Sequence, residues 1–181
     1  ILANGNYNEA VLEADVSLDS DLTIPQNYRV TVPAEYYLLT EYALTVEGQL
    51  ENNGKFSLGN SGTLAGSENV INNGSAYLNG TDSLVSGSGT VFIRKSIDLV
   101  TVSGLASTVR YGSNARLPFT LTDDTYTLIK NNDYTVRYSG ISDISIDGSP
   151  ACAISSATTF SENYYGERRD EYLILPGEIT V

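Results

Sequence analysis

Histidine, methionine and tryptophan are missing from this 181-residue chain, and cysteine occurs once, at Cys152. A single cysteine excludes a disulfide within the chain. Without histidine or further cysteine, the usual zinc ligand sets cannot be assembled. A bound metal would have to be a hard ion with oxygen ligands, such as calcium. We therefore expect no metal centre and no cofactor.

Positive charge is also scarce, since 10 Lys and Arg face 22 Asp and Glu, for a net charge of −12. Nucleic acid is an unsuitable partner because its binding depends on clustered Lys and Arg that neutralise phosphates. No apolar run approaches the roughly 18 residues of a membrane span. The chain begins at Ile1 rather than Met, so we expect a processed piece of a longer protein with flanking domains and an export signal already removed.

Apolar residues recur every 20 positions in the first half, which is the mark of a solenoid of stacked coils. Asn52-Asn53-Gly54 returns at the same offset as Asn72-Asn73-Gly74. The sequence therefore predicts a continuous apolar column along the stack. The predicted rows are Leu18/Leu38/Leu58/Leu78, Ile24/Leu44/Leu64/Leu84, Val16/Tyr36/Phe56/Ala76 and Val30/Leu50/Val70.

Short alternating segments between Pro- and Asp-rich turns identify the coils as β rather than helical. We expect a parallel β-helix over residues 1–100 with about four coils, right-handed because 20 residues exceed three strict hexapeptides. Asn8 to Ala14 has helical spacing and predicts one helical turn that caps the first coil. Glycines after Asn, at Gly54, Gly74 and Gly80, are expected where the chain turns with positive φ.

Longer alternating strands rich in Tyr and Thr follow from about residue 105. They are separated by turns at 123–124, 131–133 and 147–148, a pattern typical of a β-sandwich. We therefore place a second domain at residues 101–181. Its predicted strands are 117–121, 126–128, 134–138, 144–146 and 172–174.

Two segments resemble secreted bacterial surface proteins. Residues 22–33, Leu-Thr-Ile-Pro through Val-Thr-Val-Pro, and 44–54, Leu-Thr-Val-Glu-Gly-Gln-Leu-Glu-Asn-Asn-Gly, are similar to the β-helical repeats of such proteins. Tyr-Gly-Ser-Asn at 111–114, Thr-Leu-Ile-Lys-Asn-Asn-Asp-Tyr-Thr-Val-Arg-Tyr at 127–138 and Asn-Tyr-Tyr-Gly at 163–166 resemble the immunoglobulin-like (MBG-like) repeat modules of bacterial adhesins, although Glu167-Arg-Arg stands where those modules have Gly-Thr. The resemblance implies an exported, surface-associated, non-catalytic protein with an immunoglobulin-like second domain.

The expected function is a structural or adhesive module, a spacer or attachment element at a bacterial cell surface or in the extracellular medium, and not an enzyme. The alternative is a carbohydrate-binding module or a remnant of a β-helical polysaccharide-degrading enzyme. Possible partners are a glycan or a host or cell-surface protein. For glycan binding the aromatic platforms to test are Tyr37, Tyr42 and Tyr77, because no tryptophan is available.

Several polar groups admit both a functional and a structural interpretation. For Asn52, Asn53, Asn72 and Asn73 we favour amide ladders at a corner over a sugar-binding row. Glu35, Glu41, Glu47 and Glu51 are expected to be solvated corners rather than catalytic carboxylates. The segments 123–124, 131–133 and 143–147 predict turns rather than calcium loops. Lys130 is expected to be a surface lysine rather than one half of a Lys-to-Asn cross-link.

Overall fold

A computed structural model describes residues 7–80, 85–105, 108–110, 119–139, 151–171 and 173–175. Across these residues the chain is all-β, interrupted only by the 3-10 turns η1 (Ser67–Asn69) and η2 (Ile97–Leu99). It divides into two compact units. Unit 1 holds residues 1–95 and 159–165, and unit 2 holds residues 96–158 and 166–181. Among the residues that the structure describes, no helix is long and apolar enough to cross a membrane.

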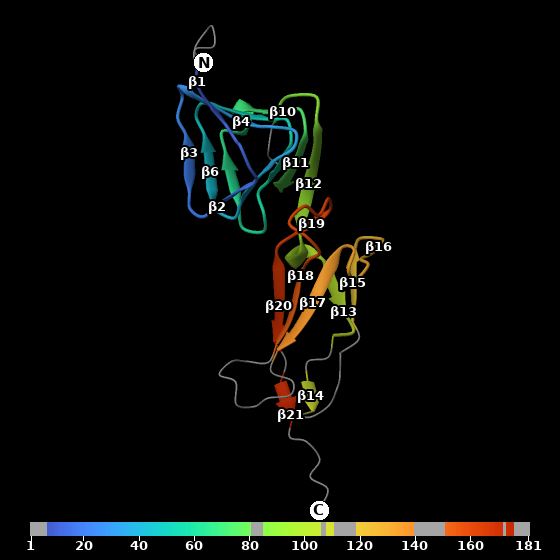
Figure 1. Cartoon of the computed structure of the whole chain (residues 1–181). Coiled ribbons are helices and arrows are strands. Elements are labelled where there is room, and N and C mark those ends of the chain that lie inside the picture. Colours follow the sequence, from blue (N-terminus) through green and yellow to red (C-terminus); the bar gives the residue numbers. More distant parts are fainter. Residues whose placement is uncertain are drawn as a thin grey trace, which may run out of the picture. The chain divides into compact units, whose positions relative to one another are not determined.

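Unit 1 is a parallel β-solenoid of about four turns (Figure 1). Its strands stack into a four-stranded sheet β1-β4-β7-β10, a six-stranded sheet β2-β5-β8-β11-β12-β19 and a three-stranded sheet β3-β6-β9. The strands are β1 (Asn8–Val11), β2 (Val16–Leu18), β3 (Leu22–Ile24), β4 (Tyr28–Val32), β5 (Tyr37–Thr40), β6 (Ala43–Val46), β7 (Gln49–Asn52), β8 (Lys55–Ser57), β9 (Thr63–Ala65), β10 (Val70–Asn72), β11 (Ser75–Asn79), β12 (Thr90–Ser96) and β19 (Tyr164–Tyr165).

The predicted register is correct for one row and wrong for parts of the others. Val30, Leu50 and Val70 pair in line, as predicted. In the six-stranded sheet, however, Leu38 lies between Val16 and Phe56, and Leu18 pairs with Thr40. Tyr36 is therefore not a core residue, and Leu44 stacks on Leu22 rather than on Ile24. Leu84 lies outside the described residues.

Corner length is the physical reason for these shifts. The corner between β4 and β5 spans residues 33–36, whereas the matching corner between β7 and β8 holds only residues 53–54. The two additional residues displace β5 by two positions against its neighbours on both sides. Because strand side chains alternate with a period of two, the displacement keeps apolar residues inside the solenoid.

The helical turn expected at Asn8 to Ala14 is also wrong. Residues 8–11 form β1, which pairs in parallel with β4 from Asn8 to Val11. All four residues of β1 are exposed, so burial does not impose this conformation. Backbone pairing to the next coil instead outweighs a local helical spacing of two apolar residues.

The solenoid interior is a column of aliphatic side chains that also includes the fully buried Phe56. Each fully buried Leu, Ile, Val or Phe contributes about 1.5–3 kcal/mol relative to exposure. The column is formed by Ile24, Val32, Leu38, Leu44, Val46, Leu50, Phe56, Leu58, Val70, Ala76 and Leu78.

Unit 2 contains two antiparallel sheets, β13-β15-β16 and β17-β18-β20, and a parallel pair β14-β21. Its strands are β13 (Thr101–Ser103), β14 (Thr108–Arg110), β15 (Thr120–Asp123), β16 (Tyr126–Thr127), β17 (Tyr134–Ser139), β18 (Ala151–Ser156), β20 (Glu167–Glu171) and β21 (Leu173–Leu175). Buried apolar residues include Ile97, Val100, Leu121, Leu128 and Ile154. The strand predicted at 144–146 lies outside the described residues.

Candidate functional site

The outer face of the six-stranded sheet carries a segment from far along the chain. Residues 159–165, here called the strap, lie between β18 and β20 in sequence but belong to unit 1. The end of the strap forms β19, which extends the sheet beside β12 (Figure 1). The Lys95 amide donates to the Asn163 carbonyl at 2.9 Å. The strap therefore covers the sheet edge that β12 would otherwise expose.

Phe160 of the strap packs between two outward-facing tyrosines of the sheet. Its ring lies 5.4 Å from that of Tyr37 and 5.4 Å from that of Tyr77, edge-on in both cases. Tyr77 also stacks on Phe92 at 4.9 Å. The Lys55 ammonium lies 5.5 Å from the centre of the Phe160 ring. Such aromatic pairs stabilise a contact by about 0.5–1.5 kcal/mol beyond the area that they bury.

Arg94 donates a hydrogen bond to the backbone of the strap. Its guanidinium donates from Nη1 to the Thr159 carbonyl at 2.9 Å and from Nη2 to the Gly59 carbonyl and Asn79 Oδ1 at 2.8 and 2.7 Å. The Ser57 hydroxyl donates to the same Thr159 carbonyl at 2.9 Å. Arg94 therefore connects three successive coils with the strap.

The Arg94 side chain is charged and nearly inaccessible to solvent, with only 1% of the residue exposed. Burial lowers the pKa of Arg94 to about 10, and the nearby Glu41 partly opposes that decrease. Its Nε has no hydrogen-bond partner among the described residues. The guanidinium stays protonated at neutral pH, so its charge strengthens the hydrogen bonds to the carbonyl groups.

The three tyrosines predicted as platforms occupy two different places. Tyr37 and Tyr77 both contact Phe160, and Tyr77 is only 7% exposed. Tyr42 lies at the corner between β5 and β6 and is 44% exposed. Sequence reasoning missed Phe160 and Arg94, although strand alternation places Arg94 on the same face as Tyr77.

The four asparagines form two amide ladders, as the sequence predicts. Inside the corner, Asn52 Nδ2 donates to Asn72 Oδ1 at 2.6 Å and to the Ser75 carbonyl, and Asn72 Nδ2 donates to the Thr90 carbonyl at 3.0 Å. Outside it, Asn73 Nδ2 donates to Asn53 Oδ1 at 3.0 Å. Asn52 and Asn72 are buried, and they satisfy backbone carbonyls there.

The inner ladder begins at Asn52 because the preceding coil has Val32 at the paired position. The Asn52 Oδ1 atom accordingly has no hydrogen-bond partner in the described part of the chain.

Two of the three glycines expected to have a positive φ differ from that prediction. Gly80 has the expected positive φ of 83°, but Gly54 and Gly74 do not. A Cβ at Gly54 would instead overlap the carbonyl oxygens of Pro33 and Tyr36.

The acidic residues of the corners divide into structural and exposed groups. Glu41 Oε2 accepts from the amides of Asn60 and Ser61 at 2.7 and 2.9 Å. Glu51 accepts from Asn53 Nδ2, whereas Glu35 and Glu47 are exposed. Among the described residues no three His, Cys, Asp or Glu side chains form a group that could hold a metal ion.

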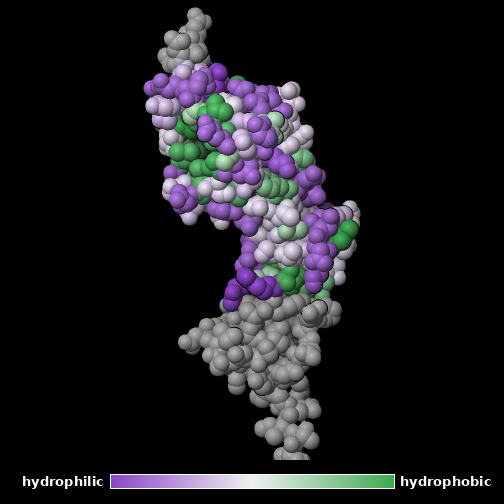
Figure 2. Space-filling model, in the orientation of Figure 1, coloured by the Kyte–Doolittle hydropathy of each residue, from purple (hydrophilic) through white to green (hydrophobic). Residues whose placement is uncertain are grey.

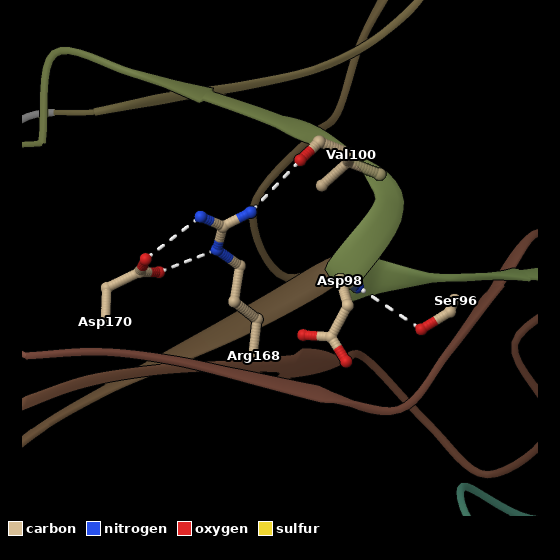
Figure 3. Close-up of polar contacts among 5 residues, drawn as sticks. All are labelled: Ser96, Asp98, Val100, Arg168 and Asp170. Atoms are coloured by element: carbon tan, nitrogen blue, oxygen red, sulfur yellow. Dashed lines mark hydrogen bonds and ion pairs between the residues drawn. The ribbon is translucent and has the colours of Figure 1, made fainter.

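Unit 2 has an ion pair on one face of β20. Arg168 donates from Nε and Nη2 to the two carboxylate oxygens of Asp170 at 2.8 and 3.0 Å, and from Nη1 to the Val100 carbonyl at 3.3 Å (Figure 3). The hydrogen bonds that Arg168 donates to Asp170 raise the pKa of Arg168, and Asp98 adds to this shift. Ser96 Oγ accepts from the Asp98 amide and caps η2. The guanidinium thereby attaches β20 to the end of η2.

The predicted turn at residues 131–133 is present. Asp133 Oδ2 accepts from the Ile129 amide and from the Tyr126 hydroxyl, both at 2.7 Å, and Asn131 has a positive φ of 67°. The hydrogen bond to Asp133 raises the pKa of Tyr126. Lys130 is exposed, which favours the surface-lysine interpretation. Residues 143–147 lie outside the described part of the chain.

Comparison with known protein families, with curated proteins and with solved structures finds no match to this chain.

Proposed function

We propose that the chain is a non-catalytic structural or adhesive module, a spacer or attachment element of a bacterial cell-surface or secreted protein. The observation that supports it most is the use made of the side chains on the solenoid. Tyr37, Tyr77, Asn52, Asn72 and Glu41 are the types that a binding or catalytic face would present, and here each contacts neighbouring coils or the strap. These groups therefore stabilise the packing of the coils on one another and on the strap.

Unit 2 is proposed to be an immunoglobulin-like sandwich. The antiparallel order β17-β18-β20 and the separate sheet β13-β15-β16, with Leu121 and Ile154 buried, support this assignment. The expected NMR signature is a set of side-chain contacts between Leu121 and residues of the other sheet. Contacts confined to one sheet would contradict a sandwich.

The alternative, a carbohydrate-binding module, rests on Tyr42, whose exposed ring is available to a ligand. A glycan array and a panel of extracellular-matrix proteins, with and without calcium, separate the two functions. Saturable glycan binding that Tyr42→Ala abolishes would favour the alternative, with the exposed Tyr28 as the matched control substitution. Saturable binding to a matrix protein indicates attachment, and no binding at all supports a spacer.

A further inference from the structure

The strap contacts the solenoid in the way that a bound peptide contacts its receptor. An aromatic side chain enters a site lined by two rings, a carbonyl one residue earlier is held by two donors, and a short strand then adds to a sheet edge. Peptide-recognition modules combine the same elements, because strand addition supplies affinity and side-chain pockets supply specificity.

We propose that the outer face of the six-stranded sheet is a peptide-binding site, occupied within the chain by residues 159–165. Its ligand class is an extended segment with an aromatic residue at the position of Phe160 and a strand-forming aromatic pair at Tyr164 and Tyr165. The inference goes beyond the proposed function, since it applies equally to a spacer and to an adhesive element.

The receptor groups are also held by contacts outside the strap. Tyr37, Ser57 and Tyr77 sit at fixed positions on β5, β8 and β11, which pair with one another in register. Arg94 is held by the Gly59 carbonyl and Asn79 Oδ1, both outside the strap, so its Nη1 stays aimed at the carbonyl of whatever segment binds. Arg94 and Ser57 are both buried, and they are the two donors to the Thr159 carbonyl.

Specificity should come from the aromatic position. Phe160 contacts Tyr37 and Tyr77, and the Lys55 ammonium faces the Phe160 ring. An aliphatic residue at this position would lose both the edge-on ring contacts and the cation–π attraction. Because Phe160 is half-buried, its replacement by Ala in a peptide should weaken binding about tenfold.

The test uses the full chain with residues 159–165 replaced by a Gly-Ser segment of equal length, and a fluorescent peptide of residues 157–167. Fluorescence anisotropy should show saturable binding to this variant. The wild-type chain should bind on the order of 100-fold more weakly, because its covalently attached strap competes at a high effective concentration. The peptide with Ala at the Phe160 position should bind about tenfold more weakly than the parent peptide.

Matched receptor variants identify the surface. In the strap-replaced chain, Tyr77→Ala should weaken binding, whereas Tyr28→Ala, at an exposed tyrosine of β4 outside the site, should not. Equal binding of the parent and Ala peptides, equal effects of the two substitutions, or no binding by a variant whose circular dichroism retains the β-solenoid would overturn the proposal.

Hydrogen exchange on the unmodified chain keeps the proposal testable if the strap-replaced chain does not fold. The Lys95 amide is bonded to Asn163 of the strap, so it reports release of β19. A separable ligand predicts that this amide exchanges through local opening, with less protection than the amides of β8. Exchange of Lys95 only together with β8 would show that the strap is an inseparable part of the solenoid and would refute the proposal.

Discussion

The buried amide ladder should behave as a coupled unit. Asn52→Ala removes the donor to Asn72 Oδ1 and to the Ser75 carbonyl, and Asn72→Ala removes the acceptor of Asn52 and the donor to Thr90. Each substitution leaves buried polar atoms without partners, so each should lower the free energy of unfolding of the solenoid by about 2–3 kcal/mol. The double variant should be less destabilised than the sum by about 1 kcal/mol, since the direct Asn52–Asn72 bond is lost only once.

The assay is native-state hydrogen exchange at the amides of β7 and β10, which reports opening of these coils separately from unit 2. The matched control is the outer pair, Asn53→Ala and Asn73→Ala, which has a direct amide bond of 3.0 Å on the same two coils but is accessible to water. Its coupling should fall to a few tenths of a kcal/mol. Additive effects at Asn52 and Asn72, or equal coupling in both pairs, would refute the reasoning.

Three further predictions concern corners and turns. Gly54→Ala should destabilise unit 1 by several kcal/mol, because its Cβ would overlap two carbonyl oxygens, whereas Gly80→Ala, at positive φ but in open space, should cost about 1 kcal/mol in thermal unfolding. Glu41→Gln keeps one oxygen that can accept from both amides and loses only the negative charge, whereas Glu41→Ala loses both contacts, so denaturant unfolding should show losses of about 1 and 2 kcal/mol; no loss in either would contradict a structural carboxylate. The pKa of Tyr126 is raised by its bond to Asp133, so this bond stabilises the fold below the ordinary pKa near 10 and is lost as pH rises through the raised value; NMR titration should show Tyr126 ionising at lower pH in Asp133→Asn, and an unchanged titration would rule out the bond.

Much of the solenoid is predictable from sequence because its determinants are local and periodic. Val30, Leu50 and Val70 recur at the spacing of one coil, and the Asn-Asn-Gly corners recur with them. A side-chain period of two within each strand decides which residues face inward. These features require only contacts between neighbouring coils.

The register errors arise where a coil changes length without changing its pattern. The corner at 33–36 contains a Pro, which is typical of the end of a strand, and a Tyr, which the sequence pattern assigns to the core. Only the pairing of β5 with its neighbours shows at which residue the strand register begins again. Gly54 shows a related ambiguity, because a glycine required by close approach of another coil is indistinguishable in sequence from one required by positive φ.

The contacts of the strap could not be predicted from the sequence because they join residues that lie far apart in the chain. Phe160 meets Tyr77 and Tyr37 across more than eighty intervening positions, and its Ser- and Asn-containing neighbours resemble a hairpin turn. β20 was missed as well, since Glu-Arg-Arg-Asp-Glu is a composition depleted in strands. Its pairing with β18 and the ion pair of Arg168 with Asp170 supply the support that propensity lacks.

The two ends of the solenoid handle their open strand edges differently. At β12 the strap supplies another strand. At the first coil, β1, β2 and β3 are edge strands. The apolar Leu12, Val16, Leu18 and Leu22 are only partly buried. Figure 2 shows hydrophobic side chains gathered on one face of unit 1. Five acidic residues lie between positions 9 and 21, without any basic residue.

Two of these acids support the solenoid directly, since Asp15 and Asp21 accept from the amides of Tyr37 and Ala43 in the next coil. The negative charge of the first coil also has a second effect. Like charges repel, so they oppose the edge-to-edge pairing to which exposed parallel strands are prone. The same acidic residues therefore join the first coil to the second and discourage association with another open edge. The acidity of this region follows from the needs of a strand edge and requires no ligand to explain it.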